Sequence, residues 1–502
     1  MMLVPVPSGL VAILVATGFY VICSVMYRLY FSALSKFPGS KTAAASGWYR
    51  FYYDYWCRGQ YVFIVKEMHQ IYGPVVRISP GELSIQDPDF YDTIYVTGSK
   101  RQDTDFDQHC TGIDFHGSHF LTMDHYLHQR RRKPLEPFFS RLGISRLQPM
   151  LAECTLHLES RFRDLQGTQT ITNPDHAFCA YSGDIIRRIC LGDDDTEGRF
   201  LDDPRFAPYC YNLIRMITMS IPLFLGFLWF GKLLAMIPET ILFGIIPNGH
   251  ILSVLKAKAR SHIREELGSA GSLTEKDLNT SLFRSIAYGN MSNSERSIER
   301  LTQEAQVLLG AGIANTFRIL SFASNHILSQ PELRERFEAE LRVPMAEWPR
   351  IVPTWTDLEK LPLLQAIIKE SLRLNYGASH RLPRVSPTVP VQYKDFTIPP
   401  GVLVSMSAYL MHTDPEVYAS PGEFVPDRWL QASTTAMRRN FVPLNRGSRN
   451  CLGQNLAMAE MSLALAVLYR PGSPRLELIG TEDTNVERVR KSSTKDVRVV
   501  VR

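Results

Sequence analysis

One cysteine stands in surroundings that suit a metal ligand. Cys451 lies in the segment FVPLNRGSRNCLGQNLA between Gly447 and Gly453, with Arg449 two residues before it and a helical apolar run after it. Glycine lets the backbone bend tightly and approach a flat ligand, and N–H groups at a helix start stabilise a thiolate. A thiolate on haem iron favours O–O cleavage, and a guanidinium can pair with a haem propionate. These residue types predict Cys451 as the axial ligand of heme (iron protoporphyrin IX).

The other cysteines carry no comparable pattern. The chain has eight, and the remaining seven stand at positions 23, 57, 110, 154, 179, 190 and 210. None are spaced as CxxC, which argues against a zinc site, and their scatter does not form a disulfide framework. We expect them to be reduced packing residues in a cytosol-facing protein.

The cysteine segment resembles the ligand loop of the cytochrome P-450 family, whose pattern is Phe-x-x-Gly-x-Arg-x-Cys-x-Gly. The spacing from Gly447 to Gly453 matches this pattern in full. The resemblance runs from Lys36 to the helix after Cys451. The segments LSKFPGS, YGPVVRISPGELSIQDPDFYD and GSRNCLG look most similar to those of membrane-bound P-450s of fungal secondary metabolism.

Two further segments match the same family in the right order. Glu370 and Arg373 lie in LLQAIIKESLRL, where their spacing puts acid and base on one helix face. The later segment FVPDRW contributes Arg428. In the family these three residues lock the core behind the haem, so the resemblance gives them a structural role.

Further cofactor contacts follow only from the resemblance. His128 and Arg132 in HQRRRKPLEPFF, and Arg384 in HRLPRVSP, stand where the family contacts haem propionates. With Arg449 they form the expected cofactor-binding set. The alternative for the first segment is a basic helix face in contact with solvent.

The expected oxygen-activating helix departs from the family. Residues 309–317 read LGAGIANTF, whereas the family pattern is Ala/Gly-Gly-x-Asp/Glu-Thr-Thr. Gly312 is expected to let the helix open beside the iron. Ala314 replaces the usual acid and Asn315 the usual threonine, and neither side chain titrates in this range. Thr316 could supply a hydroxyl only in another register, so Gly312, Asn315 and Thr316 are the catalytic candidates.

This departure leaves three functions open. Substrate hydroxyls or ordered water could complete the proton relay in a monooxygenase that uses dioxygen, the function we favour. Alternatively, the enzyme could rearrange or dehydrate a substrate that already carries oxygen. A non-catalytic haem-binding protein is the third reading.

Three local features refine these expectations. Ser292 and Glu295 form a capping-box pattern that predicts the start of the oxygen-activating helix. Leu444 stands where the family usually has phenylalanine beside the sulfur, a change that affects the reduction potential. The stretch after the last helix is shorter than usual, which puts one wall of the substrate pocket in doubt.

The N-terminus predicts a membrane anchor. Residues 3–27 carry no charge, and about 20 apolar residues span a bilayer. Arg28 and Lys36 follow and nothing basic precedes, which places the body in the cytosol. The missing basic n-region and the length argue against a cleaved signal peptide. We expect a single-pass protein of the endoplasmic reticulum membrane, with a stiff hinge around residues 36–39.

A second apolar zone covers residues 217–246 but contains several prolines and glycines. These breakers favour helices around a loop that dips into the membrane surface or roofs an apolar pocket, with ordinary core as the alternative. The sequons at Asn279 and Asn290 should be unused if the body is cytosolic.

The expected fold is mainly α with a small β region near residues 75–85 and 389–404, the cytochrome P-450 fold preceded by one transmembrane helix. The expected division is anchor 1–30, hinge 31–47 and haem-thiolate catalytic domain 48–502. The net charge of +5 is too weak to predict a nucleic-acid partner.

The expected partners are a lipophilic small molecule of terpenoid or polyketide type, dioxygen, the membrane and a source of electrons. The chain has no flavin or dinucleotide motif, so the resemblance implies an NADPH-cytochrome P-450 reductase. Arg438, Arg439 and Arg446 could form part of its docking face, although a solvated basic patch fits the same residues.

Overall fold

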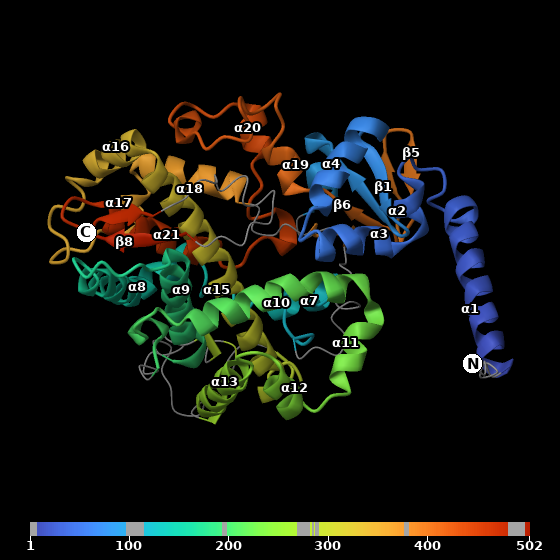
Figure 1. The fold of residues 1–502 in the computed structure, drawn as a ribbon, viewed down its shortest axis with the longest axis horizontal. Helices are drawn as coiled ribbons and strands as arrows, with labels where there is room; N and C mark the ends of the chain where they lie inside the picture. The colour runs from blue at the N-terminus through green and yellow to red at the C-terminus, as the bar shows by residue number, and fades with distance from the viewer. Residues whose placement is uncertain are drawn as a thin grey trace, which may run out of the picture.

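One long helix, α15 (Ile298–Ser329), runs through the middle of the body, and the other helices pack around it (Figure 1). The computed structural model describes residues 8–96, 115–192, 198–268, 282–283, 286, 291–375, 381–479 and 497–502. Within those ranges the chain is mainly helical with small sheets, which confirms the predicted fold class. The larger helices around α15 are α8 (Arg141–Asp164), α9 (Pro174–Leu191), α13 (His250–Gly268), α16 (Pro331–Leu341), α18 (Pro362–Leu374) and α21 (Gln454–Tyr469).

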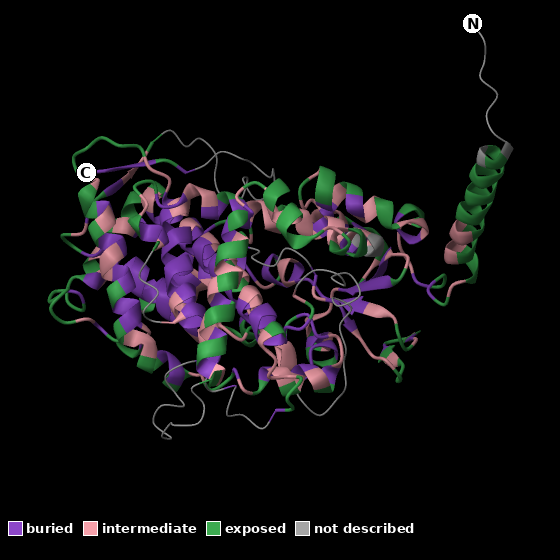
Figure 2. Ribbon diagram, turned by 90° about the horizontal axis from the view of Figure 1, so that it is seen from below, coloured by how far each residue is buried: buried purple, intermediate pink, exposed green. Residues whose placement is uncertain are grey.

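α15 is held closely against α9. A Cβ atom added to Gly312 would lie 2.7 Å from Cγ1 of Ile186, so only glycine allows this approach. The helix continues through Gly312 and does not open at this residue, contrary to the expectation. The absence of a side chain at Gly312 instead lets Ile186 of α9 pack closely against the helix. The buried interior that results is continuous across these helices (Figure 2).

The predicted start of α15 is wrong. The helix begins at Ile298, and the N-cap is Ser297, whose hydroxyl accepts a hydrogen bond from the Arg300 N–H at 3.4 Å. Glu295 does not close a capping box with Ser292 because its carboxylate pairs with Arg131 at 2.7 Å. A tertiary ion pair therefore replaces the local cap.

The main sheet lies at the end of the body next to α1 (Ser8–Met26) (Figure 1). β1 (Val75–Ser79), β2 (Glu82–Ile85), β6 (Leu403–Ser405) and β3 (Arg384–Val385) form one sheet in the order β1-β2-β6-β3. β1 and β2 are antiparallel, and β2 and β6 are parallel. Two small hairpin-like sheets pair β4 (Val391–Tyr393) with β5 (Phe396–Ile398), and β7 (Leu476–Leu478) with β8 (Val499–Val501). β1 and β2 fall in the predicted region 75–85, and β4, β5 and most of β6 fall in the predicted region 389–404.

Short helices complete the body and connect the sheet to the larger helices. They are α2 (Lys41–Ala45), α3 (Gly47–Phe51), α4 (Tyr61–Tyr72), α5 (Tyr91–Ile94), α7 (His125–Arg132), α17 (Trp355–Leu358), α19 (Ala408–His412) and α20 (Thr435–Asn440).

The first helix, α1 (Ser8–Met26), projects from the body and is exposed along most of its length (Figure 2). Residues 11–31 form a candidate membrane span of 21 residues, and its most apolar stretch is not buried against the body. α15 also passes the same length and hydropathy test, but it is the central core helix.

The predicted hinge lies against the sheet. Phe37 is buried, and the carbonyl of Pro38 accepts the Arg77 N–H at 2.7 Å. Arg77 also donates to the carbonyl of Arg28 at 2.8 Å, and Arg28 donates to the carbonyl of Ala45 at 2.9 Å. These bonds join the end of the anchor to the body, and the division of the chain at 31–47 remains a prediction.

The second apolar zone forms α10 (Pro208–Gly226), α11 (Leu228–Ala235) and α12 (Glu239–Ile245). Its large apolar side chains are not ordinary core, because several are exposed: Met219, Leu233, Met236, Ile241 and Ile245. The sequons at Asn279 and Asn290 lie outside the described residues.

A buried ion pair on α18 fixes the segments that lead to Cys451. Arg373 donates to both carboxylate oxygens of Glu370 at 2.9 and 2.7 Å, and both side chains are fully buried. Arg428, from the short helix η6 (Pro426–Trp429), donates to Glu370 at 3.1 Å. Trp429 Nε1 donates to the other oxygen at 2.8 Å. The three residues meet as the resemblance implies.

Replacing Glu370 with glutamine keeps its shape but leaves Arg373 buried without its counter-charge. We expect Glu370→Gln to lower the free energy of unfolding by about 3–5 kcal/mol. Urea unfolding of the full chain followed by circular dichroism measures this loss. The control Arg336→Ala breaks an exposed pair with Asp427 and should cost at most about 1 kcal/mol. Equal losses in the two variants would contradict the assignment.

Candidate functional site

Cys451 lies in a loop between α20 and α21 that is closed by its own backbone. The Cys451 N–H donates to the carbonyl of Leu444 at 2.9 Å, so the two ends of the loop meet. The Val442 N–H donates to Nε2 of His412 at 3.0 Å, and His412 Nδ1 lies 3.1 Å from the Arg373 carbonyl. The loop is therefore tied directly to the buried ion pair on α18.

Gly447 is required by the backbone of this loop. Its φ of 77° lies in the left-handed region that side chains disfavour. A Cβ atom there would also fall on the carbonyl oxygens of Tyr95 and Val96, closer than van der Waals contact allows. The next residue, Ser448, donates its N–H to the Val96 carbonyl at 3.0 Å. The loop thus rests on the segment after α5.

The Cys451 side chain is deep in the molecule and yet accessible. Protein surrounds it on most sides, but its side chain is exposed, as expected for a residue that faces an open space within the fold. Burial raises the pKa of the thiol, whereas the Gly453 N–H and the Arg132 guanidinium act in the opposite direction. A cation bonded to the sulfur would favour the thiolate strongly over these effects.

α7 brings His128 and Arg132 to the same loop. Arg132 donates to the carbonyl and side-chain oxygens of Asn450 at 2.6 and 2.7 Å. His128 lies between the His119 carbonyl at 2.7 Å and the Ser448 carbonyl at 3.4 Å. Burial, and then the charge of Arg449, lower the pKa of His128 to about 3, so the ring is neutral at pH 7. Both side chains hold the Cys451 loop. Because both are buried, the alternative in which they form a basic helix face in contact with solvent is wrong for these two residues.

The other two predicted arginines are also held by backbone. Arg449 donates to the carbonyls of Thr122 and Met123 at 2.8 and 2.7 Å. Arg384, at the start of β3, donates to the carbonyls of Leu382 and Pro383 at 3.2 Å, and its guanidinium lies 4.9 Å from the centre of the Tyr95 ring. Hydrogen bonds to backbone carbonyls therefore orient the side chains of all four expected cofactor contacts, which are His128, Arg132, Arg384 and Arg449. Arg384 belongs to the main sheet.

α15 presents one exposed strip in the middle of the fold. Ala311 and Asn315, one turn apart, are exposed, whereas Ile313 and Thr316 are buried. Asn315 Nδ2 donates to the Ala311 carbonyl at 3.2 Å. Asn315 is thus the catalytic candidate that reaches open space, and Thr316 points into the core.

The described residues fit a haem. A flat apolar cofactor needs an open face on a helix, a thiolate and cations for its propionates. The exposed strip of α15, the accessible Cys451 and the guanidinium groups of Arg132, Arg384 and Arg449 supply these three features.

A polar network that the sequence did not reveal joins α15 to α7. The fully buried Glu304 accepts hydrogen bonds from the His119 ring and from Arg300, the latter at 2.9 Å. The carbonyl of His119 in turn contacts His128, and the Gly117 N–H donates to Gln303 at 2.8 Å. His119 and Glu304 are 185 positions apart, and Gly117 and Gln303 are 186 apart, so no local motif signals these two contacts.

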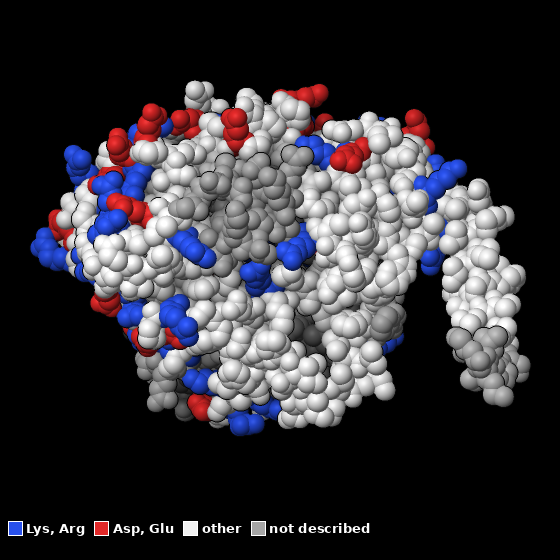
Figure 3. All heavy atoms as spheres, viewed as in Figure 1, with Lys and Arg blue, Asp and Glu red and all other residues white. Residues whose placement is uncertain are grey.

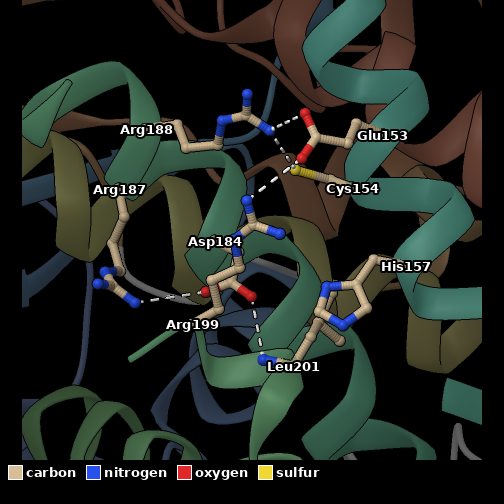
Figure 4. A pocket seen from close by; sticks show the side chains of 8 residues that line it. All are labelled: Glu153, Cys154, His157, Asp184, Arg187, Arg188, Arg199 and Leu201. Atoms are coloured by element: carbon tan, nitrogen blue, oxygen red, sulfur yellow. Dashed lines mark hydrogen bonds and ion pairs between the residues drawn. The ribbon is translucent and has the colours of Figure 1, made fainter. Parts of the chain in front are cut away.

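A second group of charged residues lines a small cavity between α8 and α9 (Figure 4). Its volume of about 10 Å³ holds no more than a water molecule. Its charges are already paired, because Arg188 and Arg199 bind Glu153 at 2.7 and 3.2 Å. Asp184 accepts the Leu201 N–H at 3.0 Å, and burial raises its pKa to about 6. This cavity is therefore not the substrate site.

The family model for cytochrome P-450 matches residues 45–470, a segment that contains the α18 ion pair, α15 and the Cys451 loop. The chain belongs to the cytochrome P-450 family. Members of this family bind haem iron through a cysteine thiolate, so haem is the cofactor of this chain.

Curated relatives place this P-450 near enzymes of fungal secondary metabolism. It is similar to the monooxygenase oblB of Aspergillus clavatus, at 44% identity over 484 residues that cover 95% of this chain and 93% of the relative. The fusicoccadiene C-8 hydroxylase of Phomopsis amygdali is 42% identical over 470 residues, covering 92% and 89%. The stellatic acid synthase of Emericella variicolor is 37% identical over 517 residues, covering 96% and 93%. The predicted resemblance to P-450s of fungal secondary metabolism is confirmed. The chain is a monooxygenase of this family.

Cys451→Ser should abolish the thiolate signature. Because serine cannot supply sulfur to the iron, the reduced, carbon-monoxide-bound spectrum should lose its haem-thiolate band. Cys154→Ser, at a buried cysteine on α8, should keep the band. A retained band in the first variant would rule out Cys451 as the ligand.

Gly447→Ala should reduce haem binding without removing any contacting side chain. The added methyl group meets two carbonyl oxygens in a left-handed conformation, so the loop must move. We expect a loss of about 1–3 kcal/mol in stability and a lower haem content per chain. Gly422→Ala, where a Cβ meets nothing within 4 Å, is the matched control and should bind haem normally.

Proposed function

We propose that this P-450 inserts one oxygen atom of dioxygen into a lipophilic small molecule of terpenoid or polyketide type in a secondary-metabolite pathway. The observation that carries the proposal is the relationship over nearly the whole chain to monooxygenases and to a hydroxylase whose printed name is fusicoccadiene C-8 hydroxylase. Bound haem supplies the reductive activation of dioxygen. The remaining roles belong to residues of this chain.

The first role is to hold the cofactor. Cys451 is the proposed iron ligand, and Arg132, Arg384 and Arg449 are the proposed propionate partners. Arg132 also pairs with Glu136 at 2.9 Å, and the described bonds of Arg384 and Arg449 go to backbone carbonyls. These bonds orient the guanidinium groups, which can pair with a carboxylate such as a propionate. His128 is neutral and would donate or accept a single hydrogen bond beside them.

The second role is to orient the substrate and water. Asn315 is exposed on the open face of α15, where its amide can donate and accept hydrogen bonds. Neither it nor Ala314 can release a proton. This supports a relay completed by water, by a substrate hydroxyl or by another residue. The same observation favours the alternative in which the substrate rearranges or dehydrates without dioxygen.

The third role is to receive electrons from an NADPH-cytochrome P-450 reductase. Arg438 and Arg439 end α20, and Arg446 lies in the Cys451 loop itself. Arg446 donates to the carbonyls of Arg438 and Arg439 at 2.8 and 3.0 Å, so the three form one basic corner beside the ligand loop. Nearby carboxylates, Asp89 and Asp92, pair with two of them. Their position next to the loop supports a docking role.

The fourth role is attachment to the endoplasmic reticulum membrane through α1, with the body in the cytosol. Besides α1, the exposed aromatic side chains Trp48, Tyr52 and Trp56 support contact with the bilayer surface, where such rings concentrate. Phe227, after α10, packs edge-on against Trp48, with the two ring centres 4.8 Å apart. The surface over α11 and the end of α10 carries almost no charged side chains (Figure 3).

Isotope labelling tests the reaction class. With the haem-loaded chain, a reductase, NADPH and ¹⁸O₂, we expect one labelled oxygen atom in the product and one in water. The substrate comes from a strain that lacks this protein and accumulates an intermediate one oxidation short. Mass spectrometry measures the label. A product formed without label would show that the enzyme transforms oxygen already present, and the lack of any product with that intermediate would support the haem-binding alternative.

A further inference from the structure

The segment of residues 117–123, which precedes α7, is held by the second turn of α15. The Gly117 N–H donates to Oε1 of Gln303 at 2.8 Å, and a Cβ atom on Gly117 would fall on that oxygen, closer than van der Waals contact allows. The His119 N–H donates to both carboxylate oxygens of Glu304, at 3.3 and 3.1 Å, and Nδ1 of its ring contacts the same carboxylate. Two adjacent side chains of α15 therefore fix this segment.

The carbonyl groups of the 117–123 segment hold two of the expected haem contacts. The His119 carbonyl lies 2.7 Å from Nδ1 of His128. Arg449 donates to two further carbonyls of the segment, at 2.8 and 2.7 Å. Because a carbonyl accepts hydrogen bonds in a limited range of directions, the position of the segment decides where the imidazole and the guanidinium point. Every link from α15 to these two side chains is thus a direct contact.

The burial of Glu304 gives the segment its fixed position. Glu304 is fully buried, and Arg300 donates to it at 2.9 Å. A carboxylate in the core is tolerated only when several donors surround it, and the backbone and ring N–H groups of His119 are two of these donors. A shift of the 117–123 segment would remove both donors from a buried charge. The segment is therefore tied energetically to α15.

We propose that Glu304 is a positioning residue for haem, which acts through the 117–123 segment on His128 and Arg449. The inference rests on the proposed haem contacts of these two residues. Glu304 keeps the imidazole and the guanidinium in one direction before the cofactor binds, so less side-chain freedom is lost on binding. Residues that orient the direct contacts of a metal centre typically change its affinity by about 10- to 100-fold.

The rate of haem release from the haem-loaded full chain to excess apomyoglobin tests this role and needs neither substrate nor dioxygen. We expect Glu304→Gln to raise that rate at least about tenfold. Glutamine keeps the shape of the side chain, but its amide nitrogen is a donor and cannot accept the His119 N–H. An unchanged rate of haem release would overturn the proposal.

Glu159→Gln is the matched control for the loss of a buried negative charge. Glu159, on α8, is 5% exposed and accepts a hydrogen bond from Arg470 at 2.6 Å. Arg470 caps the end of α21 opposite Cys451, about 24 Å along the helix. The variant should lose a similar free energy of unfolding and release haem at the normal rate. Equal acceleration in Glu159→Gln and Glu304→Gln would show general destabilisation and overturn the proposal.

A double-mutant cycle separates positioning from stability. If Glu304 acts through His128, the two residues share one effect on haem, and their substitutions are not independent. His128→Leu should therefore accelerate haem release, and the double variant with Glu304→Gln should release haem much more slowly than the product of the two single accelerations predicts. Accelerations that simply multiply would overturn the proposal.

A pair of variants at His119 gives the same test without a change at Glu304, and it holds even if Glu304→Gln does not fold. His119→Asn keeps an N–H donor near the place of Nδ1 and should release haem almost as slowly as the unaltered chain. His119→Ala lacks that donor and should release haem faster. Equal rates in these two variants would overturn the proposal.

The proposed reaction and the role of Glu304 can fail separately. An unchanged rate of haem release in His128→Leu would remove the haem contact on which the role of Glu304 rests, and so would overturn it. A failure of the chain to use dioxygen changes none of these rates, because haem release is measured without turnover.

Discussion

The buried pair of Glu370 and Arg373 is the constraint on which the rest of the site depends. A carboxylate and a guanidinium in the core are tolerable only when every donor and acceptor is used. Arg373 accordingly donates to the carbonyls of His412, Pro421 and Glu423, and Glu370 accepts from the Val425 N–H. Because these carbonyls belong to the segments that approach the cysteine loop, satisfying one ion pair also fixes the path of that loop.

The parts of the site that the sequence predicted are those whose meaning is local. Gly447, Arg449 and Cys451 lie within five residues of one another, and a left-handed glycine or a thiolate before a helix can be recognised from such a stretch. The helical pattern, the strand regions and the apolar N-terminus were predicted for the same reason. They depend on periodicity along a single segment.

The parts that could not be predicted depend on which distant segments meet. Gly312 was expected to open α15, but Ile186 from α9 fills the space where a side chain would stand. Glu295 resembled a helix cap, but Arg131 draws its carboxylate into another contact. The charge state of His128 depends on burial and on Arg449 from across the fold. Spacing within one segment contains no information about any of these partners.

The bonds between Arg28, Arg77 and Ala45 have a consequence for how the enzyme faces the lipid. They connect the last turn of the anchor to the sheet without a freely rotating joint. If α1 spans the bilayer as proposed, the body cannot swing independently of it. The angle at which α1 crosses the membrane then also sets the tilt of the body, and so decides which of its surfaces lies nearest the lipid.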